Sequence, residues 1–338
     1  MSKAVVFTDI HFGLKNNSDE FNQCCLEFID YMIDIANKEN ISTCYFLGDW
    51  HHFRSNIAVN TLSYSIEGLR KLNEAFDDVV MLLGNHDLFY RNRLDINSMI
   101  IANNFTHIRV IDKPTQIEEN VLFVPWLCNG EKLSNYKSEF IFCHAEIPTF
   151  NVNQKIKLDG EYNPLDYKTI RHIYSGHFHK RQTKNNITYI GACFSHDFSD
   201  VDDYHNKGFM IFNPSAENDE DMQKFYEWDS APKYMVLKSS EIKNKDIPIN
   251  TSLKIINDLH KSNREMIKLQ SELKDKYELN TCTIQPMEVN MSEIIDESSI
   301  EVNKAFQSLD ITILELLKEV HYDNINNEML QSIYRELN

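Results

Sequence analysis

Polar side chains that can bind metal ions or move protons follow five apolar runs of this chain. The tetrapeptide Gly84-Asn85-His86-Asp87 closes the run 79–83, so it places an amide, an imidazole and a carboxylate at the carboxyl end of an expected strand. Open α/β sheets bind their ligands at this edge. The other groups are Asp9-Ile10-His11, Gly48-Asp49, His144 and Gly176-His177-Phe178-His179. We expect these strand ends to converge on one site.

Seven of these side chains make a plausible ligand set for two metal ions: Asp9, His11, Asp49, Asn85, His144, His177 and His179. Mixed nitrogen and oxygen ligands suit Mn²⁺, Fe²⁺ or Zn²⁺ better than Mg²⁺ or Ca²⁺. Two ions roughly 3.5–4 Å apart would hold a hydroxide between them and neutralise charge on an attacked phosphoryl group. Asp49 is the natural bridging ligand, and His86 is placed to donate a proton or stabilise charge.

Each group also has a simpler explanation. A single D-x-H is weak evidence, and His51 and His52 could be surface residues. The remaining histidines of this half, His107, His172, His196 and His205, are expected to be structural or exposed. The ordered combination of G-N-H-D with a downstream G-H-x-H is far less expected by chance, and it favours the metal site.

The elements that must position these residues alternate along the first half of the chain. Apolar runs predict strands at 3–8, 43–47, 79–83, 121–124, 140–143, 173–175 and 188–190. Helical spacing predicts a helix from about Ser18, a suitable N-cap, to Asn40, with further helices near 59–75 and 94–103. This order favours a layered α/β domain with mixed sheets.

A boundary is expected near residues 213–232, because all nine glycines occur by Gly208 and eleven of the thirteen histidines by His205. Beyond it, strands at 234–237 and 281–284 around a helix at 253–277 predict a small α+β module. An acidic segment then precedes two short amphipathic helices within 303–338. These two helices could pack on their own domain or dock on another protein's helices.

Composition narrows the classes of protein. No apolar run approaches the roughly 18 residues of a membrane span, and the chain enters a strand without a cleavable leader, which predicts a cytoplasmic location. Seven cysteines without a C-x-x-C pair predict reduced core thiols. The net charge of −17 argues against nucleic acid, but residues 286–338 hold eleven acidic and only three basic side chains. Basic residues adjoin the motifs instead: Arg54, Arg91, Arg93, Lys180 and Arg181.

The ordered motifs D-x-H, G-D, G-N-H-D, H and G-H-x-H resemble those of the calcineurin-like metallophosphoesterases, over residues 4 to about 213. The resemblance implies a four-layer αββα sandwich with a dinuclear metal centre. It implies that one ion is held by Asp9, His11, Asp49 and His179, and the other by Asp49, Asn85, His144 and His177. His86 would be the catalytic histidine, with Asp87 supporting it.

Within that superfamily the details favour nucleases. The segment Gly48–Arg54 lacks the G-D-x-V-D-R-G pattern of protein phosphatases, so a phosphoprotein substrate is not expected. His52, three positions after Asp49, resembles the second histidine of the SbcD/Mre-type DNA-repair nucleases and would join His86 in catalysis. The segment Gly84–Asn92 (GNHDLFYRN) is similar to their T-even phage members, which would place the protein in a host cytoplasm.

The whole organisation is also similar to those nucleases. It implies a nuclease domain at 1–231, a small α+β capping domain at 232–286, an acidic linker at 287–302 and a C-terminal helical pair at 303–338. In this family the pair binds the base of an SbcC-type coiled-coil ATPase, and the nuclease forms a homodimer through helices corresponding to 59–75 and 94–103. The implied function is Mn²⁺-dependent 3′-to-5′ exonuclease and single-strand endonuclease action on DNA in repair and recombination. The ATPase is expected to supply much of the grip on DNA.

Two alternatives remain open. The same metal chemistry would serve a phosphodiesterase that acts on a nucleotide or another small molecule, although residues 232–338 have no obvious purpose there. A scaffold without activity on the same fold is less favoured, because every expected ligand is present.

Overall fold

Two six-stranded sheets carry the residues expected at the site. The computed structural model describes residues 2–128, 130–152, 157–201 and 203–286. The first sheet has the order β12-β11-β1-β2-β3-β4, with bounds Ala4–Phe7 (β1), Thr43–Phe46 (β2), Asp78–Leu82 (β3), Ile108–Ile111 (β4), Phe209–Phe212 (β11) and Gln223–Tyr226 (β12). Strands β1 to β4 are parallel, whereas β11 runs antiparallel to both β1 and β12.

The second sheet has the order β5-β6-β7-β8-β10-β9. Its strands are Thr115–Glu118 (β5), Val121–Val124 (β6), Phe140–His144 (β7), His172–Gly176 (β8), Gln182–Lys184 (β9) and Ile187–Tyr189 (β10). Strands β6, β7, β8 and β10 are parallel, and the edge strands β5 and β9 pair antiparallel. Both sheets therefore align several strand ends on one side, as the sequence motifs require.

The central strands are apolar on both faces because both faces are covered. In β1 all four residues are buried: Val6 faces the second sheet, where it packs with Tyr45, Phe142 and Tyr174, while Phe7 faces the opposite way. The core between the sheets is largely aromatic and β-branched. The seven strands predicted for these two sheets are present, whereas β4, β5, β9, β11 and β12 were not predicted.

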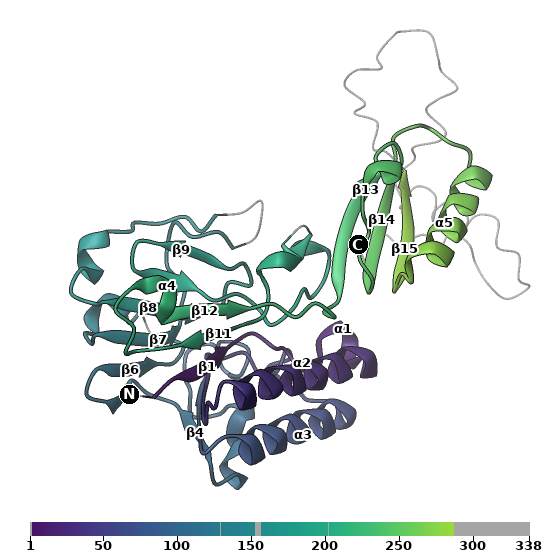
Figure 1. The fold of residues 1–338 in the computed structure, drawn as a ribbon. Helices are drawn as coiled ribbons and strands as arrows, with labels where there is room; N and C mark the ends of the chain where they lie inside the picture. The colour runs from purple at the N-terminus through teal and green to yellow at the C-terminus, as the bar shows by residue number, and fades with distance from the viewer. Residues whose placement is uncertain (1, 129, 153–156, 202, 287–338) are drawn as a thin grey trace, which may run out of the picture. The chain divides into compact units, whose positions relative to one another are not determined.

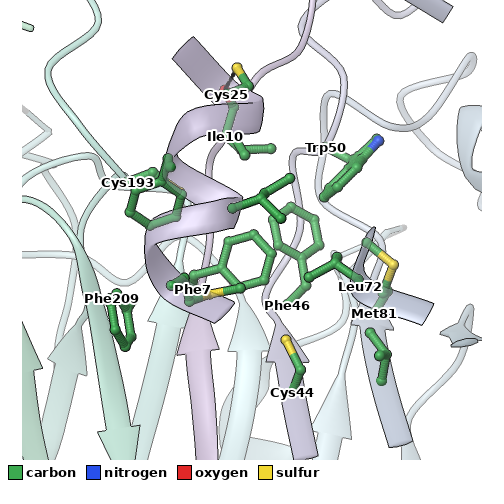
Figure 2. Packing of buried hydrophobic residues seen from close by; sticks show 14 of the residues in the cluster. Phe7, Ile10, Cys25, Cys44, Phe46, Trp50, Leu72, Met81, Cys193 and Phe209 are labelled. Atoms are coloured by element: carbon green, nitrogen blue, oxygen red, sulfur yellow. Dashed lines mark hydrogen bonds between the residues drawn. The ribbon is translucent and has the colours of Figure 1, made fainter. Parts of the chain in front are cut away.

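Two long helices cover the other face of the first sheet, α2 (Asp19–Lys38) and α3 (Val59–Ala75), and they pack against each other (Figure 1). Figure 2 shows the core beneath them, where Phe7, Phe46, Leu72 and Met81 from the sheet and helices lie together. Ser18 caps α2 as predicted, because its Oγ accepts a hydrogen bond from the Phe21 N–H at 3.2 Å. The remaining short helices of this layer are α1 (Leu14–Asn17) and the 3₁₀ helix η1 (Ser98–Asn104).

The outer face of the second sheet packs under shorter elements. Its apolar cluster joins Ile141, Ile173 and Ile187 to Phe150 and Tyr167, beneath the 3₁₀ helices η2 (Leu133–Asn135) and η3 (Pro164–Tyr167). The remaining short helices near the sheets are η4 (Phe198–Asp200), η5 (Tyr204–Asn206) and α4 (Asp219–Met222). The mixed sheets and the helices that flank them confirm the predicted fold class. The helices on the outer face of the second sheet are shorter than α2 and α3.

A third sheet is parallel and has the order β13-β14-β15. Its elements are Lys233–Lys238 (β13), the 3₁₀ helix η6 (Ile242–Asn244), Thr251–Asn257 (β14), α5 (Asn263–Tyr277) and Thr281–Pro286 (β15). The prediction of one helix over 253–277 was wrong in its first part. Residues 253 and 255 are buried on one face of β14, a period of two, and the helix begins only after Ser262, which forms a capping box with Glu265.

Three further predictions concern the cysteines, membrane-spanning helices and the C-terminal region. All seven cysteines are free thiols and six of them are buried, as predicted. No helix among the described residues has the length and apolar run that a bilayer crossing requires. The predicted linker and helical pair at 287–338 lie outside the described residues, and the division at 231/232 stays a prediction.

Candidate metal centre

The expected ligands lie on loops that leave the strands in unusual backbone conformations. Asp9 after β1, Asp49 after β2 and His177 after β8 have φ values of 54°, 63° and 88°, and His11 has 55°. Left-handed φ is uncommon for residues other than glycine, and such residues cluster at functional sites. Gly84 lets the loops meet, since a Cβ there would lie 2.2 Å from Asp49 Oδ1.

One group of ligands surrounds Asp9, and we call it the Asp9 group: Asp9, His11, Asp49 and His179. His11 Nε2 lies 3.2 Å from His179 Nε2, 3.7 Å from Asp49 Oδ2 and 4.0 Å from Asp9 Oδ1. His179 Nε2 lies 3.9 Å from the same Asp9 oxygen. All but His179 are buried. Two imidazole nitrogens and two carboxylate oxygens therefore point at a common centre.

A second group, the Asn85 group, comprises Asp49, Asn85, His144 and His177. The Asn85 Oδ1 atom lies 3.0 Å from His144 Nε2 and 2.9 Å from His177 Nδ1. His144 Nε2 is 3.5 Å from Asp49 Oδ2, the same oxygen that faces His11. Asp49 Oδ2 is thus common to both groups, which is the position expected of a bridging ligand. The other oxygen, Oδ1, accepts the His86 backbone N–H at 2.8 Å.

Hydrogen bonds hold the imidazoles of the Asn85 group in the orientation that a ligand needs. His144 Nδ1–H donates to the Leu47 carbonyl at 2.6 Å, so Nε2 is the nitrogen that faces Asn85 and Asp49. His177 Nε2 lies 3.1 Å from Glu146 Oε1, so Nδ1 is the nitrogen free to face Asn85. Ligating histidines commonly donate their second nitrogen to a carbonyl or carboxylate in this way. Sequence reasoning missed Glu146, although it stands only two residues after His144.

The pKa shifts of the ligand side chains fit a site that binds cations. Burial raises the pKa of Asp9 to about 7, because a buried carboxylate loses hydration. Burial acts in the same direction on Asp49, but the charge and hydrogen bond of His144 outweigh it and hold the pKa of Asp49 well below its usual range. Burial also lowers the pKa values of His11 and His179 well below 6.5, which keeps these imidazoles neutral. Neutral imidazoles and crowded carboxylates fit two divalent ions.

The two expected catalytic histidines lie beside the Asp9 group. His86 Nδ1 donates to the His52 carbonyl at 2.7 Å, so its Nε2 faces away from that bond, and its ring meets the His11 ring edge-on at 4.9 Å. The His52 ring stacks on His86 with centroids 5.4 Å apart and an interplanar angle of 20°. Burial lowers the pKa of His52 to about 4.

Asp87 does not support the His86 imidazole, contrary to expectation. Its buried carboxylate accepts backbone N–H groups of Gly84 and Asp49 at 2.9 Å, Trp50 at 3.0 Å and His51 at 3.2 Å. The carboxylate thus joins the loop after β2 to the loop after β3. Its role is to fix the backbone on which Asp49 and His86 stand.

The other buried histidines differ in whether their ring nitrogens have hydrogen-bond partners. His51 is buried, not at the surface, and its two nitrogens each lie 2.8 Å from a hydroxyl, of Ser65 and of Ser98. His172 is a core residue 2.8 Å from Thr188 Oγ1. His196 is also buried, but neither of its ring nitrogens has a hydrogen-bond partner among the described residues.

Comparisons with known proteins place the chain in a family. The calcineurin-like phosphoesterase family model matches residues 2–188. Exonuclease subunit 1 of Enterobacteria phage T4 is 28% identical over 275 residues, covering 78% of this chain and 79% of that protein. The DNA double-strand break repair protein Mre11 of Methanococcus maripaludis is 23% identical over 288 residues, covering 78% and 72%.

Two solved structures also align with the chain. The nuclease MPE of Pseudomonas putida aligns with a TM-score of 0.30 at 18% identity, covering 57% of this chain and 70% of that one. The E. coli phosphoesterase Yfce aligns with a TM-score of 0.32 at 13% identity, covering 63% and 88%. The family model and the two sequence relatives, together with the paired ligand groups, support the predicted resemblance to SbcD/Mre-type nucleases. The chain belongs to the calcineurin-like phosphoesterases and is a hydrolase of phosphodiesters.

Proposed function

We propose that this chain is the nuclease subunit of an SbcCD-type recombination and repair complex, and that it cuts DNA with Mn²⁺ as a 3′-to-5′ exonuclease and single-strand endonuclease. The observation that carries the proposal is the pair of ligand groups sharing Asp49 Oδ2, with His86 and His52 stacked beside them. The names of the phage exonuclease subunit and of Mre11 support DNA as the substrate.

In this proposal the Asp9 group holds one ion and the Asn85 group the other. Two bound divalent ions would activate a water and neutralise charge on the phosphate. The chain's own contribution is to hold the ligands rigidly: Leu47 and Glu146 fix the imidazoles of His144 and His177, and Asp87 fixes the backbone around Asp49. The mixed nitrogen and oxygen ligands favour Mn²⁺ over Mg²⁺.

His86 is the proposed catalytic residue. Hydrolysis of a phosphodiester joins a water oxygen to phosphorus, breaks one P–O bond and returns a proton to the leaving sugar oxygen. Because His86 Nδ1 is engaged by the His52 carbonyl, Nε2 is the atom that would donate this proton or a hydrogen bond to the phosphate. His52 would assist by stacking on the His86 ring and limiting its rotation.

The variant H86Q tests this role. We expect both ions to stay bound, since His86 lies outside both ligand groups, while Mn²⁺-dependent digestion of single-stranded DNA falls by about 10²–10⁴-fold. Bound manganese is counted by elemental analysis, and digestion by release of labelled nucleotides. H107Q is the matched control, because His107 lies away from the centre and contacts the Asn73 and Phe76 carbonyls. Normal digestion by H86Q would reject the assignment.

Two partners complete the proposal. A second copy of the chain would cover apolar side chains that α3 and η1 leave exposed, including Val59 (85% exposed) and Ile100 (69%). The base of a coiled-coil ATPase would bind residues 303–338, which lie outside the described residues. Deletion of 303–338 should abolish co-purification with such an ATPase; unchanged co-purification would reject this part.

A phosphodiesterase for nucleotides is the second candidate, and a cavity beside the Asn85 group favours it. This cavity has a volume of about 730 Å³, and Trp126, Glu146, Tyr162 and Tyr167 line it. Small-molecule sites have similar volumes. Faster cleavage of a cyclic or dinucleotide than of DNA at equal phosphodiester concentration would favour this candidate.

A further inference from the structure

His196 lies against the Asp9 group without a role in the function proposed above. Its ring meets the His179 ring edge-on with centroids 4.7 Å apart, and the His11 ring at 5.3 Å. The residue is only 2% exposed, and both ring nitrogens lack a hydrogen-bond partner among the described residues. A buried polar group left unpaired destabilises the folded chain, so its retention calls for an explanation.

Core packing alone does not explain this residue. The buried histidines used for structure are hydrogen-bonded: His51 lies 2.8 Å from each of two serine hydroxyls, and His172 lies 2.8 Å from Thr188. His196 instead turns its ring toward two imidazoles whose own nitrogens face the centre of the Asp9 group. One ring nitrogen from each of His11, His179 and His196 lies within 4.8 Å of the others.

That spacing is compatible with one cation among three imidazoles. Nitrogen ligands about 2.0–2.1 Å from an ion lie roughly 3–4 Å from one another. The His11 and His179 nitrogens, at 3.2 Å, already meet this condition. A His196 ring nitrogen lies within 4.8 Å of a ring nitrogen of each of these two residues.

A buried ion pair holds His196 and His179 in place together. The Lys207 ammonium donates to the His179 carbonyl at 2.6 Å and to Asp200 Oδ1 at 2.7 Å. Asp200 Oδ2 in turn accepts the His196 backbone N–H at 2.9 Å. These hydrogen bonds fix the backbones of His179 and His196 at the site. Lys207 is only 2% exposed, so the network also buries a charge, which is unfavourable by itself.

We propose that His196 is a third imidazole ligand of the ion held by the Asp9 group. The inference rests on the proposed two-ion centre and adds a residue that the family resemblance did not supply. It makes the two metal positions unequal: three imidazoles face one ion and two imidazoles with an amide face the other. With His196 the Asp9 group offers five ligand side chains against four in the Asn85 group, so it would hold its ion more strongly.

Diffraction from crystals of the wild-type chain soaked in Mn²⁺ tests the inference directly. Anomalous scattering locates each ion, and we expect a His196 ring nitrogen within about 2.0–2.4 Å of the ion beside Asp9. An ion at that position with both His196 nitrogens beyond about 3 Å would overturn it. No ion at either position would overturn the proposed two-ion function as well, so the two failures are distinguishable.

Calorimetric titration of Mn²⁺ into H196Q gives a second measurement that needs no DNA. We expect one of the two binding events to weaken by about 10-fold or more while the other stays within twofold. The control H172Q removes a buried histidine far from the centre and should leave both events unchanged. Two unchanged events in H196Q would overturn the inference, and the wild-type crystals decide the question if H196Q fails to fold.

Discussion

Glu146 shows how much of the centre depends on residues that are not ligands. Its carboxylate holds His177 Nε2 at 3.1 Å, and loss of such a partner typically weakens metal binding by 10–100-fold. We therefore predict that E146Q binds Mn²⁺ about 10-fold more weakly at one of two positions, measured by calorimetric titration. E161Q is the control, because Glu161 lines the same cavity but does not contact a ligand. Equal losses in both variants would point to the general charge of the cavity instead.

Asp87 allows a stability prediction at the same scale. Four backbone N–H groups converge on its carboxylate, and an amide in its place offers one acceptor oxygen in place of two. We expect D87N to lose about 1–3 kcal/mol of unfolding free energy, measured by urea denaturation with a chelator present. The exposed Asp77 provides the control D77N, which should unfold like wild type.

Residue types revealed the ligands but not the residues that orient them. The seven expected ligands were identified because several carboxylates, imidazoles and an amide each follow an apolar run, and the structure brings them into two groups. Glu146 and Lys207 carry no such pattern, and Asp87 carries it without being a ligand, since their roles depend on which groups the fold places beside them. The catalytic roles of His86 and His52 stay predictions.

At the scale of elements, strands were easier to predict than helix boundaries. Short apolar runs such as those within β1, β3 and β7 favour buried strands, and the structure confirms them. The segment after Leu253 misled because Leu253 and Ile256 have the i, i+3 spacing of a helix, whereas in the structure Leu253 and Ile255 share the buried face of a strand. The Ser262 and Glu265 pair was the local signal for the true start of α5. The helix expected near 94–103 proved to be the 3₁₀ helix η1.

The surface of α3 and η1 gives a prediction about assembly. If a second copy covers it, I100E should weaken homodimer formation by at least about 10-fold, because a charge would be buried without a partner. Sedimentation analysis over a range of concentrations measures this. I267E on α5 is the matched control, since Ile267 is similarly exposed at 62%. A wild-type chain that sediments as a monomer at every concentration would reject the dimer.

For the molecule as a whole, the centre should contribute to stability. Each ion at 100 times its dissociation constant adds about 2.7 kcal/mol, because it binds only the folded chain. We expect Mn²⁺ to raise Tm by several degrees relative to a chelator, measured by calorimetry. The variant D49N removes the oxygen common to both groups and should lose this increase. An equal increase in D49N would show that the ions bind elsewhere.

The ligands come from both sheets: Asp9, Asp49 and Asn85 follow strands of the first, and His144 and His177 belong to the second. Bound ions would therefore act as a reversible crosslink across the sandwich. Separation of the sheets would pull apart the ligands of each ion, so bound ions would oppose that separation. Occupancy of the centre would then report on the integrity of the whole domain, and a destabilised variant would lose its ions before it lost its strands.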